Sequence, residues 1–303
     1  MDPKQFLSAS RVIIVAGKGG VGKSTVSAAL VLAARRLGMT AMLVETDGKP
    51  LLISPDTASG ITAQTVTPAD ALSEYLEGRG LRRISRRLVS AGIVDVVAQA
   101  SPGIDNLLVL GKVKQLERAG AADLIVVDGP AAGHAVTMLR TPRAMLDSVK
   151  VGPILQQAKD VLEMLNDEHR CQVMLVTLPE PTPVNECVET AFALEDEVGV
   201  RLAPVVVNQV DSTPTLVVPN EMNADSPYAM AAAYRNMRTS THRASCAELS
   251  ARLPLPQLRI PLDVPPDVDH IASRLIEAIE QLPDRTAQGI SGPDESTTTG
   301  SPT

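Results

Sequence analysis

Residues 11–25 read RVIIVAGKGGVGKST and place a glycine-rich loop directly after a run of β-branched apolar residues. The segment that follows repeats apolar residues at helical spacing and ends at Gly38, which favours a helix stop. The repeating residues are Val26, Ala29, Leu30, Ala33, Ala34 and Leu37. A strand, a glycine loop and an amphipathic helix begin a β-α-β unit, so the chain is predicted to adopt a doubly wound α/β fold.

Short β-rich runs alternate with helical patterns along the rest of the chain. Their hydrophobicity is continuous rather than alternating, which indicates strands covered on both faces and therefore a mainly parallel sheet. The predicted strands are residues 11–16, 41–46, 106–110, 123–128, 172–178, 203–208 and 258–262. A final amphipathic helix is predicted over Asp267–Gln281.

The chain length of 303 residues is enough for one large domain, which we expect over residues 1–282. Helical patterns near residues 67–100 and 138–168 read as insertions that form a helical subdomain above the sheet. The second pattern is broken at Val151–Pro153. Residues 283–303 lack the apolar content needed to pack, so this tail is predicted to be disordered.

Charge and aromatic content disfavour a nucleic-acid-binding role. The net charge is −7, and aromatic residues make up 2% of the chain, with no tryptophan. Single-stranded nucleic acids are usually held by exposed aromatic rings, and duplex DNA by basic patches. No nucleic-acid partner is therefore expected, and the core must be largely aliphatic.

Cysteine use and the absence of long apolar runs indicate the compartment. Cys171, Cys187 and Cys246 lie far apart without a C-x-x-C pair, so neither a disulfide framework nor a zinc site is indicated. The N-terminal MDPKQFLSAS lacks a signal-peptide core, and no apolar run has the roughly 18 to 20 residues that span a membrane. These features predict a reduced, cytoplasmic protein that meets a membrane only through partners.

The loop from Gly17 to Ser24, GKGGVGKS, satisfies the pattern G-x-x-x-x-G-K-[ST]. Glycines let successive backbone N–H groups turn toward phosphate oxygens, and the following helix adds its positive end. Lys23 is expected to reach the β- and γ-phosphates of a nucleotide, and the Ser24 hydroxyl to bind Mg²⁺. ATP and Mg²⁺ are the predicted cofactors, and a tight glycine turn without a ligand is the alternative.

A second lysine, Lys18, lies near the start of the loop. The stretch GKGGVGKST resembles the deviant Walker A motif of dimeric ATPases that include MinD/ParA partitioning proteins, the nitrogenase iron protein and ArsA-type ATPases. In that group the early lysine reaches the nucleotide held by the other subunit, where it neutralises charge on the transferring phosphoryl group. The resemblance therefore implies a nucleotide-dependent dimer with Lys18 acting in trans, against the alternative of a solvated loop lysine.

The stretch DLIVVDGPAAGHAVTMLRTP, residues 123–142, resembles switch II of ArsA-type arsenite-pump ATPases and their relatives that target tail-anchored proteins. There an aspartate at a strand end is followed by a loop that closes in Gly-His and by a Leu-rich helix. These positions fall on Asp128, Gly133 and His134, while the family's Thr-Ala-Pro-Thr reads Gly129–Ala132. The resemblance implies that Asp128 holds Mg²⁺-bound water; His134 either relays switch movement or simply enters the helix.

Further segments resemble the ArsA-type family over most of residues 11–282. The stretch 101–114 is similar to a Pro-Gly segment that leads into a helix. Asn208 matches an asparagine that contacts adenine, and Pro261 belongs to a proline-rich turn that closes over the base. The implied nucleotide-binding set is Gly17, Lys18, Gly19, Gly20, Val21, Gly22, Lys23, Ser24, Thr25, Asn208 and Pro261.

Switch I departs from the family pattern. Asp47 follows the second predicted strand, where the family has an aspartate that positions or deprotonates the attacking water. The family continues with Pro-Ala-His, whereas this chain has Gly48, Lys49 and Pro50. Asp47 is predicted to be catalytic, together with Lys18 and Lys23, and a simple turn aspartate is the alternative. The departure puts the turnover rate in question more than nucleotide binding.

The predicted function is that of an ArsA-type, Mg²⁺-dependent ATPase which hydrolyses ATP at a dimer interface to switch or drive a partner or client. The resemblance implies a role related to anion transport or membrane-protein targeting, in a homodimer or with a paralogous ATPase. Without clustered thiols, the soft-metalloid site of arsenite pumps has no candidate. The alternatives are a slowly hydrolysing nucleotide-binding subunit that recruits a partner, and a ParA/MinD-like partitioning ATPase.

Two side-chain groups have alternative interpretations. The basic stripe Arg79–Arg87 contains five arginines and is either a solvated helix face or a surface for anionic lipid or an acidic partner. Met138, Met145 and Met164 belong to the second helical pattern, where they either pack in the core or line a client groove. Solvation of the arginines and core packing of the methionines are preferred.

Overall fold

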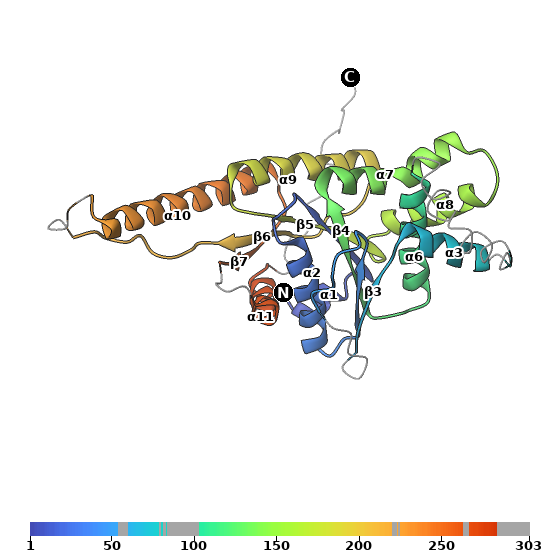
Figure 1. Ribbon diagram of the computed structural model, residues 1–303, viewed down its shortest axis with the longest axis horizontal. Helices are drawn as coiled ribbons and strands as arrows, with labels where there is room; N and C mark the ends of the chain where they lie inside the picture. Colours follow the sequence, from blue (N-terminus) through green and yellow to red (C-terminus); the bar gives the residue numbers. More distant parts are fainter. Residues whose placement is uncertain are drawn as a thin grey trace, which may run out of the picture.

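A single parallel sheet forms the centre of the computed structural model (Figure 1). The structure describes residues 1–53, 60–78, 80, 83, 103–219, 223, 225–262 and 267–283. Seven strands lie in the order β3-β2-β4-β1-β5-β6-β7. They are β1 Val12–Gly17, β2 Ala41–Glu45, β3 Ile61–Thr65, β4 Leu124–Ala131, β5 Cys171–Thr177, β6 Val205–Val210 and β7 Gln257–Pro261. Every described pairing is parallel, which confirms the predicted α/β class.

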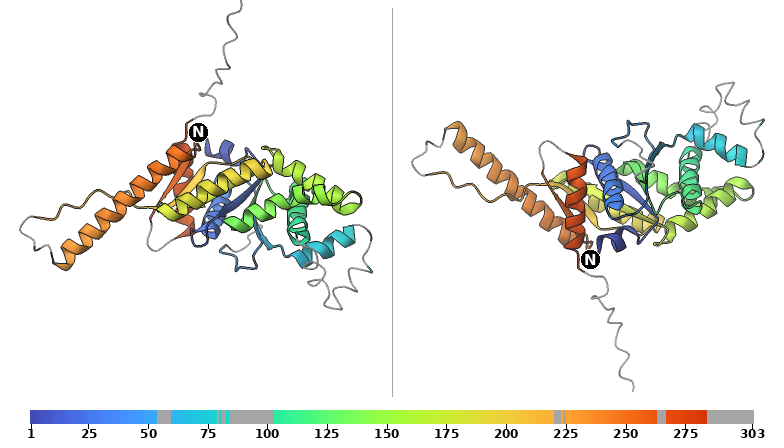
Figure 2. Two further views of the ribbon diagram at one scale, coloured as in Figure 1. Left: turned by 90° about the horizontal axis from the view of Figure 1, so that it is seen from above. Right: turned by 90° about the horizontal axis from the view of Figure 1, so that it is seen from below.

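Helices cover both faces of the sheet (Figures 1 and 2). Within the described residues they are α1 Pro3–Leu7, α2 Lys23–Arg36, α3 Pro68–Gly78, α6 Ile104–Arg118, α7 Ala132–Ser148, α8 Pro153–Asn166, α9 Pro181–Ala193, the π-helix η2 Leu194–Val198, α10 Pro227–Arg252 and α11 Val268–Glu280. Along β1, Val12 and Ile14 join one apolar cluster with α6 to α10, whereas Ile13 and Val15 join another with α1, α2 and α11. Burial on both faces explains the continuous apolar runs of the strands.

The prediction of a strand at residues 106–110 is wrong, because these residues lie inside α6. A short apolar run fits a buried helix as well as a buried strand, and its flanks decide between them. Here Gly103 adopts a left-handed conformation with φ of 88° at the helix start, and Val113 extends the buried face by another turn. The resemblance of residues 101–114 to a segment leading into a helix pointed to this outcome.

The strand β3 at the sheet edge was not predicted. Its sequence, ITAQT, pairs with β2, but only Ile61 is buried. An edge strand with one partner does not need the continuous apolar run that marks the central strands. The search for such runs therefore missed it.

The expected loop between Asp128 and His134 is also absent, because β4 continues to Ala131 and α7 begins at Ala132. Gly129 permits this path, since a Cβ atom there would lie 2.5 Å from the Val15 carbonyl oxygen on β1. The pairing of β1 with β4 shifts register between Val15 and Gly17. Switch II is thus an extension of a central strand rather than a free loop.

The two regions predicted as helical insertions both contain helices in the described residues. The first region contains α3, while most of residues 81–100 lie outside the described residues. In the second region, α7 begins six residues before the predicted start at 138, and a break separates it from α8. Gly152, with φ of 103°, and Pro153 at the first turn of α8 make that break as predicted. The predicted tail lies outside the described residues from 284 on.

The last two helices differ in how they meet the sheet. α11 buries Ile271, Ala272, Leu275 and Ile279, as its spacing predicted. α10 has 26 residues and extends well past β7, beside the segment that follows β6 (Figures 1 and 2). The protruding part of α10 and the segment after β6 together form an arm, and exposed apolar side chains gather on it. They are Leu216, Val217, Tyr228, Met230, Tyr234 and Met237. Among the described residues, no helix combines the length and apolarity that crossing a bilayer requires.

Candidate functional site

The glycine-rich loop joins β1 to α2 at the carboxyl edge of the sheet, between β4 and β5. Two of its glycines are needed for packing: a Cβ at Gly17 would collide with the Val176 carbonyl oxygen, and one at Gly22 with the Asn208 side chain. Gly19 and Gly20 differ, because a Cβ at either would meet no atom within 4 Å. The middle of the loop therefore faces open space, as a phosphate cradle requires.

Lys23 opens α2 and is 7% exposed. Its Nζ donates a hydrogen bond to the Lys18 carbonyl oxygen at 3.1 Å, so the ammonium folds over the loop. Burial lowers the pKa of Lys23, and the charge of Lys49 lowers it further, while Asp128 and Asp47 oppose both effects. A partly desolvated cation in this place gains from any anionic ligand that enters the cradle.

Asp128 lies on β4 beside Val15 of β1 and Glu45 of β2, and is 4% exposed. Its Oδ1 accepts a hydrogen bond from Ser27 Oγ at 3.3 Å, and Thr46 Oγ1 donates to its backbone carbonyl at 2.9 Å. Sequence reasoning found Asp128 but missed Ser27. A serine on the buried, otherwise aliphatic face of α2 was the available signal.

Asp47 follows β2, and its carboxylate is already paired. Its Oδ2 accepts from Lys49 Nζ at 2.7 Å, and this hydrogen bond raises the pKa of Lys49. The backbone N–H of Asp47 donates to Glu45 Oε1 at 2.6 Å. Glu45 is 2% exposed, and its Oε2 has no hydrogen-bond partner among the described residues. Sequence reasoning missed this buried carboxylate, although an acid inside an apolar strand is unusual.

Lys18 forms an ion pair with Glu186 of α9 in the same chain. The two side chains are 36% and 40% exposed, so water reaches both. The resemblance predicted that Lys18 acts on another subunit. In this single chain its ammonium has a partner in cis, and Glu186, 168 positions away, could not be paired with it from the sequence.

Asn208 lies inside β6, two residues before its end at Val210 and not at the strand terminus as expected, and Pro261 is the last residue of β7. The buried Asn208 side chain donates from Nδ2 to the Val21 carbonyl oxygen at 2.9 Å and accepts from the Gln209 backbone N–H at 3.0 Å. It therefore ties β6 to the phosphate loop, a contact that sequence reasoning did not foresee. Pro261 is half-buried and pairs with Val210 on β6.

The remaining candidates lie apart from the loop. His134 is exposed in the first turn of α7. Met138 and Met164 are buried, and Met145 packs against the same cluster, so the core interpretation of the methionines is confirmed. Of the arginine stripe only Arg83 falls within the described residues.

The residues around the loop fit a Mg²⁺–nucleotide complex. Ser24 is half-buried in the first turn of α2, and Asp128 and the orphaned Glu45 oxygen lie on neighbouring strands, so the nearby donors are all oxygens. The described residues contain no group of three His, Cys, Asp or Glu that could hold a metal. Mg²⁺ in nucleotide sites usually takes one or two protein ligands and completes its shell with phosphate and water, which matches this set.

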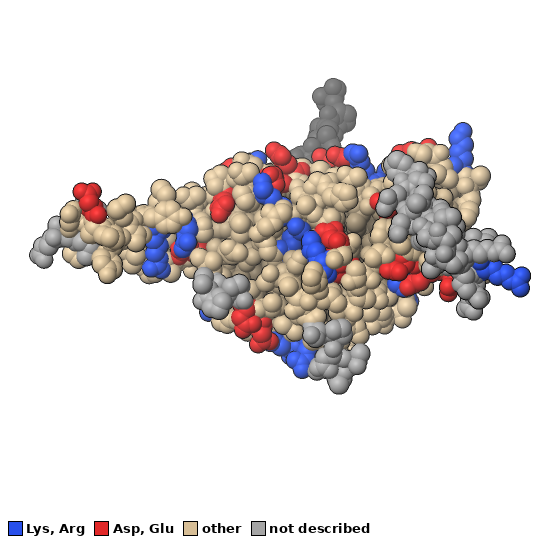
Figure 3. Space-filling view, viewed as in Figure 1, with Lys and Arg blue, Asp and Glu red and all other residues tan. Residues whose placement is uncertain are grey.

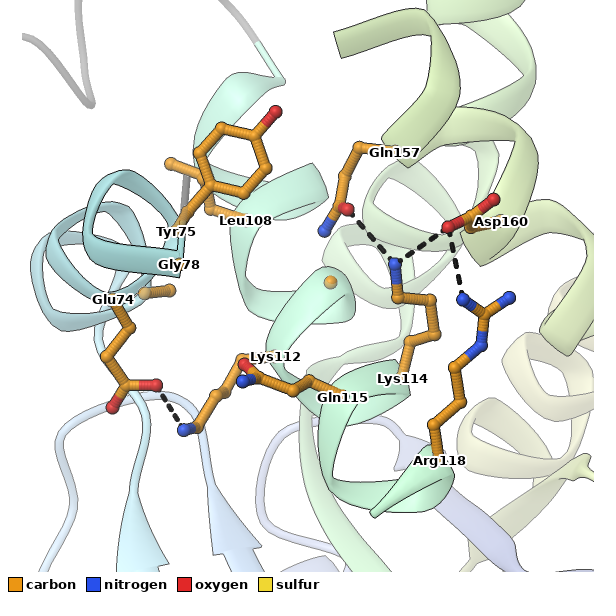
Figure 4. Close-up of a pocket in the computed structure, with 12 residues that line it drawn as sticks. Glu74, Tyr75, Gly78, Leu108, Lys112, Lys114, Gln115, Arg118, Gln157 and Asp160 are labelled. Carbon is orange, nitrogen blue, oxygen red and sulfur yellow. Dashed lines mark hydrogen bonds and ion pairs between the residues drawn. The ribbon is translucent and has the colours of Figure 1, made fainter. Parts of the chain in front are cut away.

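A separate cavity of about 300 Å³ lies among α3, α6 and α8 (Figure 4). Lys112 pairs there with Glu74, while Lys114 donates to Gln157 at 3.0 Å and to Asp160 at 3.2 Å. Arg118 contacts the same Asp160 carboxylate at 3.3 Å. Each of these three cations is thus paired with a residue that lines the cavity.

Comparisons with known proteins identify the family of this chain. A family model described as anion-transporting ATPase matches residues 10–152, which include the loop and both switch segments. ATPase BagA of Mycobacterium tuberculosis is 30% identical over 233 residues, covering 67% of this chain and 66% of that protein. An arsenical pump-driving ATPase of Escherichia coli is 27% identical over 194 residues, covering 61% of this chain and 32% of that protein.

A eukaryotic ATPase is also similar to this chain. ATPase get3 of Schizosaccharomyces japonicus is 25% identical over 171 residues, covering 50% of this chain and 52% of that protein. The chain therefore spans less than the full length of each of these relatives. Together with the glycine loop after β1 and the seven-stranded parallel sheet, these matches establish that the chain belongs to the ArsA-type, anion-transporting ATPase family.

Proposed function

We propose that this chain binds ATP with Mg²⁺ at the loop between β1 and α2 and hydrolyses it. The observation that carries the proposal is the approach of Lys23, Asp128 and Asp47 to a loop whose central glycines border open space. A desolvated cation beside carboxylates suits a metal-bound polyphosphate, because each charge of the complex meets an opposite charge. The ATPase names of the relatives support the same activity.

Each residue has a distinct role in this proposal. Lys23 holds the β- and γ-phosphates, and Ser24 binds Mg²⁺ directly, with Asp128 acting through a water. The metal, when bound, neutralises charge on the phosphate oxygens. Asp47 orients the attacking water and accepts its proton. Backbone N–H groups of Gly17–Thr25 hold the phosphates; Asn208 and Pro261 lie on the base side.

The nucleotide is proposed to lie at a dimer interface in which Lys18 reaches the partner subunit. Lys18 must then leave Glu186, and since exposed ion pairs are worth at most about 1 kcal/mol this exchange is not costly. The partner is a second copy or a paralogous ATPase, and the complex acts on a client or a membrane-associated protein. The names of the relatives, which concern arsenical pumps and get3, support this class of partner without identifying it.

Steady-state phosphate release tests the proposal. The purified chain with Mg²⁺ and ATP is expected to turn over, and Asp47→Asn to lower the rate by about 100-fold while nucleotide still binds. Asp147→Asn, on the exposed end of α7, is the matched control and should leave the rate unchanged. Unchanged turnover in Asp47→Asn would remove this carboxylate from catalysis.

A second candidate function is a nucleotide-dependent interaction subunit that hydrolyses slowly. The observation that favours it is the Lys49–Asp47 ion pair, which occupies the carboxylate that the reaction needs. Mass in solution, measured with and without a non-hydrolysable ATP analogue, separates the candidates. Turnover with an analogue-induced dimer supports the self-sufficient ATPase, whereas binding without turnover on a monomer supports the interaction subunit.

A further inference from the structure

Lys49 brings an additional cation to the nucleotide site. It lies two residues after Asp47 in the segment that departs from the family pattern, and its Nζ is 2.7 Å from Asp47 Oδ2. Its side chain is 48% exposed, so the ammonium is held by one carboxylate and remains accessible to a ligand.

Lys49 interacts electrostatically with several residues of the site. Its charge lowers the pKa of Lys23, the residue that folds over the phosphate loop. The charges of Asp47, Asp128 and Glu45 in turn raise the pKa of Lys49. Two cations and three carboxylates therefore lie close together beside β2 and β4. Such a cluster of mixed charges changes its pairing when a strongly anionic group enters, because each new charge competes with an existing partner.

Lys18 does not supply this second cation within the chain. Its ammonium pairs with Glu186 on α9, on the other side of the loop from β2. Lys49 instead pairs with Asp47, one of the carboxylates near Lys23.

We infer that Lys49 recognises the γ-phosphate of ATP: it exchanges its Asp47 partner for this terminal phosphate. The inference rests on the proposed nucleotide site and extends it. The exchange is non-covalent: Lys49 remains an ammonium, its hydrogen bond to Asp47 Oδ2 is replaced by one to a phosphate oxygen, and Asp47 is left free to hold water. ATP thereby activates its own catalytic carboxylate, whereas ADP, which lacks the γ-phosphate, leaves the Lys49–Asp47 pair closed.

Calorimetric binding of ADP and of a non-hydrolysable ATP analogue, each with Mg²⁺, tests this inference on the full chain. Lys49→Gln is expected to weaken the analogue about tenfold while changing ADP affinity less than about twofold, as loss of one charge-assisted contact would. Lys49→Arg should keep most of the preference for the analogue. Lys150→Gln, at an exposed lysine after α7, is the matched control and should change neither affinity.

A double-substitution cycle separates partner exchange from simple repulsion between Asp47 and phosphate. Asp47→Asn should strengthen analogue binding, and in partner exchange most of this gain is lost when Lys49→Gln is also present. A gain that persists in the double variant would reflect repulsion alone and would overturn the exchange.

The two proposals fail in different ways. If the wild-type chain binds neither nucleotide, the proposed function is overturned and this inference with it. If both nucleotides bind and Lys49→Gln weakens both equally, or neither, the nucleotide site survives and the role of Lys49 is overturned.

Discussion

At the scale of single residues, the site depends on glycines of two kinds. Gly17, Gly22 and Gly129 lie where a Cβ would meet a neighbouring atom, whereas Gly19 and Gly20 border open space. The first kind lets strands and loop approach closely, and the second keeps room for a ligand. Substitutions should separate these roles.

Gly129→Ala is expected to destabilise the fold by about 2–3 kcal/mol, because its methyl group would be forced against the Val15 carbonyl on a central strand. Gly133→Ala, four residues on in α7, meets no atom within 4 Å and should change stability by less than about 0.5 kcal/mol or raise it slightly. Urea unfolding of both variants without nucleotide measures the difference. Equal losses of stability would mean that β4 and β1 adjust freely.

At the scale of elements, α10 is attached to the sheet through a charged junction. Arg238 pairs with Asp211 at 2.6 Å, and the Asp211 backbone N–H donates to His242 Nδ1 at 3.0 Å. Burial lowers the pKa of His242, and the nearby Arg238 lowers it further, against the opposing charges of Asp211 and Glu180. The neutral imidazole is thus the form that the folded junction accepts.

This junction predicts a pH dependence. Because the folded pKa of His242 lies below its unfolded value of 6.5, its contribution to stability is complete above about pH 6.5 and is lost as the pH falls below that value. His242→Asn, which retains an acceptor but does not titrate, should show a smaller loss between pH 7.5 and 5.5 in urea unfolding. An identical loss in both proteins would assign the pH dependence to other groups.

The sequence predicted the elements unevenly, for physical reasons. The five central strands carry continuous apolar runs because both their faces are covered, so all five could be located, and the edge strand β7 was located by its shorter apolar run. The run at 106–110 is equally apolar, but its neighbouring residues place it in a helix. The edge strand β3 was not located because only one of its residues is buried and it has no continuous apolar run. Motif spacing located Lys23, and the family resemblance located Asp47 and Asp128. The contacts of Lys18 with Glu186 and of Asn208 with Val21 join residues more than 160 positions apart. Only folding brings such partners together.

At the scale of the whole molecule, the proposed dimer and the Lys18–Glu186 pair would compete for the same Lys18 ammonium. Acidic and basic side chains are interspersed over the face in Figure 3, outside the atoms left undescribed, so the visible surface offers no large single-sign field to drive assembly. Local changes of ion-pair partner, such as that of Lys18, should therefore set the protein concentration at which the proposed dimer forms.

Glu186→Gln should release Lys18 and lower the protein concentration needed for the analogue-bound dimer by about three- to fivefold, the range of an exposed ion pair. Glu189→Gln, an exposed acid one turn further along α9, is the matched control and should leave the threshold unchanged. Sedimentation equilibrium with the ATP analogue gives both values. A threshold that moves equally in the two variants would reflect net charge rather than release of Lys18.

The three thiols have a practical consequence for studying motion in this molecule. Cys171 on β5, Cys187 on α9 and Cys246 on α10 are all buried and free, and burial raises the pKa of the first two to about 12. Since only an exposed thiolate reacts with alkylating reagents, each cysteine is expected to remain unlabelled until its own helix or strand unfolds locally. The natural chain thus carries one thiol in a strand of the sheet, one in the covering helix α9, and one in the part of α10 that packs against the core. The order in which they are labelled, read by mass spectrometry with and without nucleotide, would reveal which part yields first.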